Sequence, residues 1–474
     1  MNTKVSVRRQ IRGFVLIWIA ITFIMGVATF FAIYLTYVPE GSGTGLSFDR
    51  SAPLPATASS VPVVAIASHT PAASLTPRPS ATPQSVAQNA PTDEPTEPPP
   101  PTDVPTPQPV EDKRFAVGIQ VQESPDFNPD NQDGWLRAVA DQLNMQWIKQ
   151  QVPWETMEET KGEVNWAILD LVLPSAAKFD VKVMLSIVAA PDWAREPDVF
   201  LERQGPPANP QDFTDFVAAI LERYPGMIHA IEVWNEQNLD REWTSIKGLR
   251  AADYVSLLQA TYERVKAIDP GIIVISGALS PTGLNDGIGA WDDFVYMEQM
   301  LDAGLLDYAD CIGAHHNGIN VGPSDPWDNV PNDPAVRFRG PFDNPHHSWT
   351  FRSTLQGYAS RIARAGGDQK LCVTEFGWAS TEDIGAFPPG FEFAEDNTLE
   401  EQKTWLVEAM GNMEEWDIVW LAFVWNLNYG PQAGWDPNND NVPYSLIGPD
   451  FEFRPAYDAI RDWQLDYLER TGQN

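Results

Sequence analysis

The sequence predicts an α/β fold, a closed (β/α)₈ TIM barrel, for residues 113–474. Short apolar, β-branched runs alternate there with longer runs whose apolar residues recur every three or four positions, which is typical of parallel strands joined by helices. This alternation repeats eight times. The first run is not followed by Gly-x-Gly-x-x-Gly, which disfavours an open doubly wound sheet. Eight regular units therefore favour closure into a barrel.

The N-terminal segment predicts a membrane anchor. Residues 1–12 form a basic tail, and residues 13–38 carry no charged side chain. As a helix, the uncharged stretch would be roughly 39 Å long at about 1.5 Å per residue, which is longer than a signal-peptide core and long enough to cross a bilayer. The basic tail predicts a cytoplasmic N-terminus, so we expect a single-pass protein of the cell membrane with residues 113–474 extracytoplasmic.

Residues 39–112 predict a disordered stalk between anchor and barrel. The segment is rich in Pro, Thr and Ser and holds 17 of the 42 prolines. Such a composition cannot bury enough apolar area to fold, and its prolines favour extended polyproline II.

Within residues 113–474 we expect each strand to precede a helix. The strands are predicted at 115–122, 145–153, 181–190, 229–235, 272–278, 311–316, 370–375 and 419–426. The clearest helices are predicted at 211–223, 251–268 and 399–416.

Composition limits the partners. The net charge of −34 argues against nucleic acid as a partner. Cys311 and Cys372 lie near the starts of two predicted neighbouring strands, so a disulfide is conceivable, but we expect buried free thiols. Only six histidines are present and no His-x-His lies on the first strand, so we expect no metal and no other cofactor.

Two carboxylates end predicted strands and indicate acid/base chemistry. Glu236 follows the fourth strand and Glu375 ends the seventh, and strands in these positions lie nearly opposite each other across a barrel mouth. Cleavage of a glycosidic bond needs such a pair, one protonated and one ionised. Strict alternation would turn Asn235 and Glu236 to opposite faces, so we expect the strand to end or bulge there.

The runs 234–236 (Trp-Asn-Glu) and 374–378 (Thr-Glu-Phe-Gly-Trp) resemble the clan of retaining (β/α)₈ glycoside hydrolases that includes families 5 and 39, which are cellulase- or xylosidase-like. The resemblance implies a glycosidase that hydrolyses O-glycosyl bonds of a poly- or oligosaccharide. It assigns Glu236 as acid/base, Glu375 as nucleophile and Asn235 as the residue that bonds the sugar 2-hydroxyl.

Other residues are expected to bind substrate, one of them because of the resemblance. Trp425 matches a sugar-stacking tryptophan that often precedes a non-proline cis peptide bond. Trp154 and Trp378, at strand ends, are further candidate sugar platforms. Lys149 is expected to line the site where many clan members carry arginine.

The sixth strand departs from the clan pattern. His-x-Tyr is common there, whereas this chain reads His315-His316-Asn317. We expect His315 either to line the site or to serve packing. Asn317 or Tyr429 would supply the hydrogen bond to Glu375 that the missing tyrosine would make.

Two further possibilities accompany a monomeric retaining glycosidase. The barrel could be a non-catalytic, membrane-tethered polysaccharide-binding protein, or a transglycosylase whose acceptor site favours sugar over water.

In the long loop 318–350, we expect the adjacent His346 and His347 to be solvated rather than metal-binding, because neighbouring residues rarely point at one ion.

Overall fold

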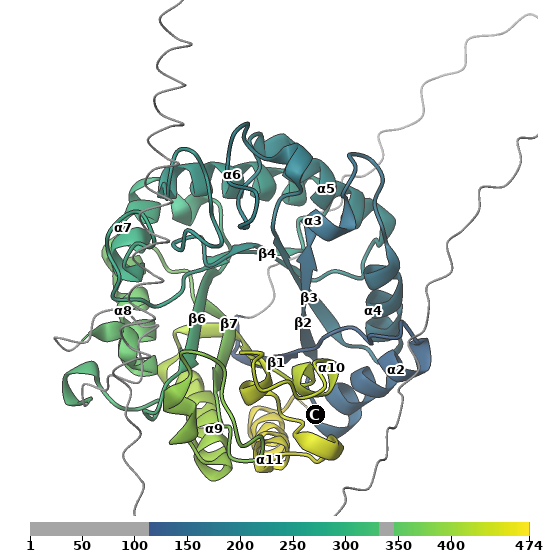
Figure 1. The fold of residues 1–474 in the computed structure, drawn as a ribbon, viewed down its shortest axis with the longest axis vertical. Coiled ribbons are helices and arrows are strands. Elements are labelled where there is room, and N and C mark those ends of the chain that lie inside the picture. Colours follow the sequence, from purple (N-terminus) through teal and green to yellow (C-terminus); the bar gives the residue numbers. More distant parts are fainter. Residues whose placement is uncertain (1–112, 331–345, 474) are drawn as a thin grey trace, which may run out of the picture. The chain divides into compact units, whose positions relative to one another are not determined.

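Eight parallel strands form a ring that is surrounded by helices (Figure 1). The computed structural model describes residues 113–330 and 346–473. The strands are β1 Ala116–Gln120, β2 Trp147–Pro153, β3 Lys182–Val188, β4 Ala230–Asn235, β5 Ile273–Ala278, β6 Ile312–Gly318, β7 Leu371–Trp378 and β8 Val419–Val424. All eight predicted strands are confirmed, with ends that differ by at most a few residues.

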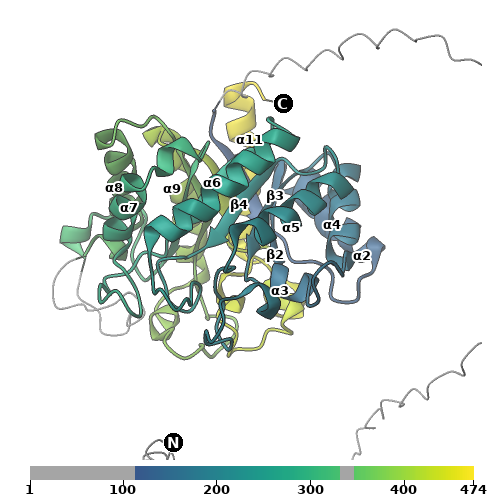
Figure 2. The same ribbon diagram turned by 90° about the horizontal axis from the view of Figure 1, so that it is seen from above.

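Helices connect each strand to the next on the outside of the ring. They are α2 Pro129–Arg137, α3 Trp154–Met157, α4 Ala167–Lys178, α5 Pro210–Arg223, α6 Ala251–Ile268, α7 Asp293–Asp302, α8 Phe351–Arg364, α9 Leu399–Trp416, α10 Tyr429–Gln432 and α11 Pro455–Thr471. Figure 2 shows α5 and α6 lying in front of β3 and β4. The bounds predicted for α6 and α9 are confirmed, and α5 begins one residue earlier than expected.

Local sequence explains where several helices begin. The Asn209 side chain caps α5 and is followed by Pro210, whose fixed φ suits the first helical turn. Thr398 and Glu401 form a reciprocal capping box at the start of α9. These caps satisfy backbone N–H groups that would otherwise lack partners at the mouth-facing ends of the helices.

The ring closes between β5 and β6. Hydrogen-bonded neighbours follow the order β5-β4-β3-β2-β1-β8-β7-β6. Two isolated parallel bridges, Ile275 to Cys311 and Leu279 to Ala314, join the remaining edges. The described residues therefore form a nearly closed (β/α)₈ barrel, in which the carboxyl ends of the strands share one face.

The lower part of the barrel interior is apolar and contains a disulfide. Trp147, Met184 and Phe423 pack there with the two cysteines. Cys311 and Cys372 are bonded, with Cα atoms 5.7 Å apart. The expectation of free thiols was wrong, because neighbouring parallel strands bring these two positions within bridging range.

The expected basic tail, anchor and stalk, residues 1–112, lie outside the described residues. Within 113–330 and 346–473, none of the helices combines the length and apolar character that a bilayer span requires.

Candidate active site

A cluster of buried charged side chains lies on the inward face of the barrel strands. It consists of Lys149 on β2, Glu232 on β4, Glu236 directly after β4, His315 on β6 and Glu375 on β7. Each is at most 9 % exposed. Buried charges are costly unless they are paired and hydrogen-bonded, so the contacts within this cluster determine what each group does.

The end of β4 turns Glu236 into the mouth. The strand ends at Asn235, and Trp234 and Glu236 have φ angles of +77° and +42°, which are strained values for non-glycine residues. Gly277 on β5 accommodates this turn, since a Cβ there would lie 2.7 Å from the Val233 carbonyl oxygen. The prediction that strand alternation breaks at Glu236 is confirmed.

His315 lies between the two predicted catalytic carboxylates. Its Nδ1 is 3.3 Å from Oε1 of Glu236 and 3.7 Å from Oε2 of Glu375. The two oxygens are therefore at most about 7 Å apart, which is the sum of these distances. This upper limit is compatible with the spacing of about 5 to 5.5 Å between the carboxyl groups of retaining glycosidases. The structure brings Glu236 and Glu375 to one site.

Glu375 is held from two sides. Lys149 donates from Nζ to Oε1 at 2.9 Å, and Asn317 donates from Nδ2 to Oε2 at 3.3 Å. We expected either Asn317 or Tyr429 to donate a hydrogen bond to Glu375, and Asn317 makes this bond. Tyr429 is also close to Glu375. Burial and the negative charge of Glu375 raise the pKa of the Tyr429 phenol.

Lys149 also pairs with Glu232, at 3.5 Å from Oε2. Burial lowers the pKa of Lys149, but the charges of Glu232 and Glu375 outweigh burial and raise it overall. The ammonium has no exposed surface and two carboxylate partners. Lys149 therefore orients Glu375 instead of binding substrate as we expected.

Glu236 is paired with an arginine from the following loop. Arg241 donates from Nη2 to Oε2 at 2.8 Å, and its side chain is 65 % exposed. Burial would raise the pKa of Glu236, but the hydrogen bond with His315 and the charge of Arg241 hold it well below its usual range. Glu236 is thus an anion in the protein without substrate.

A third carboxyl group, Glu242, lies beside this pair. Its Oε1 is 3.4 Å from Nε of Arg241. Burial and the negative charge of Glu236 raise the pKa of Glu242 to about 7. Neighbouring carboxyl groups with pKa values pushed apart are typical of sites that carry out acid/base chemistry.

Comparison with known proteins was made by sequence and by structure. Neither a protein-family model nor a curated protein sequence matches the chain. A family 39 glycoside hydrolase from Bacteroides cellulosilyticus WH2 aligns in structure with a TM-score of 0.53 and 19 % identity, over 74 % of this chain and 64 % of that one. This chain thus spans less than two thirds of that protein's length.

Two further solved structures resemble the barrel. A GH5_18 protein from Bifidobacterium longum subsp. infantis aligns with a TM-score of 0.53 and 12 % identity, over 74 % of this chain and 79 % of that one. A glucosidase from Croceicoccus marinus aligns with a TM-score of 0.50 and 12 % identity, over 76 % and 69 %. The chain shares the fold of these glycoside hydrolases. The resemblance to the barrels of families 5 and 39 is confirmed at that level.

Two other predicted residues lie near the carboxylates. Asn235 ends β4, and its Oδ1 is buried with no hydrogen-bond partner among residues 113–330 and 346–473. Trp425 follows β8, its peptide bond to Asn426 is cis as expected, and its ring centroid is 5.7 Å from Nζ of Lys149. Asn235 thus lies next to Glu236 in the chain, and Trp425 lies next to Lys149.

Trp154 and Trp378 are core residues, which corrects the expectation that they bind sugar. Trp154 is fully buried, stacks on Phe216 and donates from Nε1 to Glu158. Trp378 is 1 % exposed and donates from Nε1 to the Val321 carbonyl oxygen. Both indoles turn from the strand ends into the layer between strands and helices, so neither face is open to a ligand.

Sequence reasoning missed Glu232, Arg241 and Glu242. Glu232 had a usable signal, because an acidic residue inside the apolar run 230–234 must be paired when buried, and Lys149 interrupts another strand in the same way. Arg241 and Glu242 lie in a polar loop, where charged residues are common and carry no such signal.

Proposed function

We propose that this chain is a retaining glycoside hydrolase that cleaves O-glycosidic bonds of a poly- or oligosaccharide by double displacement. The observation that carries the proposal is the contact of one His315 nitrogen with both Glu236 and Glu375, which limits their separation to about 7 Å. A purely sugar-binding barrel has no need for two carboxylates at this spacing.

In the first step Glu375 attacks the anomeric carbon and the bond to the leaving oxygen breaks. Lys149 and Asn317 hold the attacking carboxylate in place. The leaving oxygen takes a proton from Glu236, and the products are a glycosyl ester on Glu375 and a free alcohol. Preorganised partners suit this step because they cost no reorganisation in the transition state.

Glu236 must gain a proton before it can act as the acid. In the protein without substrate, Arg241 stabilises the anion, but the arginine side chain is largely exposed and free to be displaced. We propose that a sugar in the leaving-group position displaces Arg241. Glu236 then loses a positive neighbour while it stays buried, and its pKa rises.

The second step reverses the roles. Glu236 is a carboxylate after giving its proton to the leaving oxygen, and the neutral ester on Glu375 no longer places a negative charge beside it, so the carboxylate form is favoured. It then deprotonates the water that attacks the anomeric carbon, and Glu375 leaves as a carboxylate. The configuration of the sugar is retained because two displacements occur.

Two residues near the pair are the proposed substrate contacts. Oδ1 of Asn235 can accept a hydrogen bond from the sugar 2-hydroxyl, and Trp425 offers an indole ring for the apolar face of a pyranose.

We further propose that the catalytic domain, residues 113–474, is monomeric and is held outside the cell membrane by residues 13–38 through the stalk 39–112. The buried disulfide supports an oxidising location.

The function is tested on full-length protein with a glycan panel. The wild-type protein should release sugar with retained anomeric configuration, as measured by NMR of the products. Glu236→Gln and Glu375→Gln should each lose at least about 10³-fold in kcat, as expected for an acid/base and a nucleophile. Glu415→Gln, which changes an exposed residue of α9, should behave as wild type.

Other outcomes separate the alternatives. Binding without turnover would indicate a receptor, and sugar transfer to an added glycan in preference to water would indicate a transglycosylase. Normal activity in either catalytic variant would refute the assignment.

A further inference from the structure

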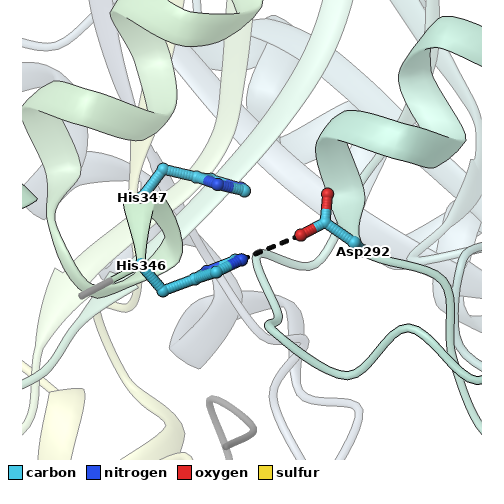
Figure 3. A group of neighbouring side chains, drawn as sticks. All are labelled: Asp292, His346 and His347. Carbon is cyan, nitrogen blue, oxygen red and sulfur yellow. Dashed lines mark hydrogen bonds and ion pairs between the residues drawn. The ribbon is translucent and has the colours of Figure 1, made fainter. Parts of the chain in front are cut away.

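A second cluster of ligand-type side chains lies at the start of α7 and just before α8. Asp292 caps α7, and His346 and His347 lie at the short 3₁₀ turn His347–Trp349. Figure 3 shows the two imidazoles one above the other, with the Asp292 carboxylate facing them. One ligand atom from each residue lies within 4.8 Å of the others.

The cluster corrects the expectation that these histidines are solvated. The side chains of His346 and His347 are 25 % and 12 % exposed, and each pairs with a carboxylate. Nε2 of His346 is 2.9 Å from Oδ2 of Asp292. The turn at 347–349 allows adjacent residues to present both rings on one side, which sequence neighbours do not ordinarily do.

One ring nitrogen of His347 has the kind of partner that metal-binding histidines usually have. Nε2 of His347 is 3.0 Å from Asp293, a fully buried carboxylate that also accepts a hydrogen bond from Tyr358. Nδ1 of His346 accepts a hydrogen bond from the Ser348 backbone N–H at 3.2 Å and lies 2.8 Å from Oγ of Ser348. A carboxylate partner of this kind fixes ring orientation and increases ligand basicity. When Nε2 of His347 keeps Asp293, Nδ1 is the nitrogen it can offer to an ion.

Packing holds the rings in position. Phe294 stacks on His347 with centroids 3.4 Å apart and planes 5° from parallel. The His346 and His347 centroids are 4.2 Å apart. Ligands that are already oriented lose little side-chain entropy when an ion binds.

We propose that Asp292, His346 and His347 bind one divalent transition-metal ion, zinc first among them. Two imidazoles and one carboxylate suit zinc, whereas calcium and magnesium prefer all-oxygen sites. Because Asp292 belongs to the β5–α7 connection and the histidines precede α8, the ion cross-links two connections that follow neighbouring strands. Its role is structural and independent of the glycosidase chemistry proposed above.

The test is zinc binding by full-length protein after removal of metal with a chelator. Titration with ZnCl₂, measured by calorimetry, should reveal one saturable site. Saturating zinc should also raise Tm by a few degrees. CaCl₂ and MgCl₂ should give neither effect. Asp292→Asn keeps an N-cap residue on α7, so it removes the charged ligand without removing the cap.

Asp292→Asn and His347→Gln should each weaken zinc binding at least about 100-fold and abolish the Tm shift. His69→Gln is the matched control, since it removes a histidine from outside the barrel and should bind zinc as wild type does. Absence of a saturable 1:1 site in wild type would overturn the proposal. So would equal affinity in wild type and Asp292→Asn, which would identify adventitious binding.

Discussion

Arg241 donates a hydrogen bond to Glu236 at 2.8 Å from a side chain that is 65 % exposed. The buried carboxylate assigned as the acid is therefore neutralised by a group that projects into solvent. Before substrate binds, this ion pair stabilises the carboxylate form of Glu236. As long as it persists, it opposes protonation of Glu236 and therefore proton donation by it. We propose that Arg241 acts through this contact, and that its displacement raises the pKa of Glu236.

The first prediction concerns Arg241→Gln. Loss of the positive neighbour should raise the pKa of Glu236 in the free protein, because burial then acts with less opposition. An acid is active below its pKa, so the fall of kcat/KM on the alkaline side should move to higher pH. Arg250→Gln, which changes another exposed arginine paired with a carboxylate, should leave the profile in place. An unchanged profile for Arg241→Gln would count against its role.

The second prediction concerns the buried pair of Lys149 and Glu232. Lys149→Met leaves Glu232 and Glu375 without their cation and should lower the free energy of unfolding by about 3–5 kcal/mol. Adding Glu232→Gln should restore part of that loss, as denaturant unfolding of the single and double variants would measure. Lys161→Ala, in an exposed ion pair, should have little effect on the free energy of unfolding. Additive effects of the two buried substitutions would contradict the coupling.

The third prediction concerns Glu242 and pH. Its pKa is 4.5 ordinarily and about 7 in the folded protein. A raised carboxyl pKa means that stability is full below pH 4.5 and falls as the pH rises through 7. Glu242→Gln should therefore have its largest stabilising effect relative to wild type at pH 8, on the order of 3 kcal/mol, and less at pH 4. Equal differences at both pH values would show that Glu242 does not titrate in this range.

The fourth prediction concerns the disulfide. Cys311 and Cys372 are 61 residues apart, so their bond constrains a long loop in the unfolded chain. Cys311→Ala with Cys372→Ala should reduce stability by about 2–4 kcal/mol. Wild-type protein unfolded without reductant should show no reactive thiol, since the chain has only these two cysteines. Two reactive thiols in that experiment would rule out the bond.

Most of the barrel could be predicted because apolar periodicity directly reflects burial. Residues 251–268 and 399–416 were predicted with their observed bounds, and their apolar spacing leaves little choice of face. The bond between Cys311 and Cys372 could not be predicted, because it depends on a Cα distance that sequence does not contain. Closure between β5 and β6 depends on isolated bridges and likewise has no local signal.

The site was predicted as far as its strand-end motifs extend. Glu236, Glu375 and Asn235 follow from the ends of two strands, and Asn317 from the missing tyrosine. Trp154 and Trp378 were misjudged because position at a strand end does not say whether an indole turns to the mouth or to the helices. The roles of Lys149 and Glu232 emerge only when distant strands are brought together.

The central claim is that Glu375 forms a covalent bond to the sugar, and trapping that bond tests it most directly. Full-length protein would be treated with a panel of 2-deoxy-2-fluoro glycosides carrying a good leaving group, then digested and analysed by mass spectrometry. The account predicts a single glycosylated peptide with the sugar on Glu375, and none in Glu375→Gln. Label on Glu236, or turnover of the parent glycoside with inverted configuration, would contradict it.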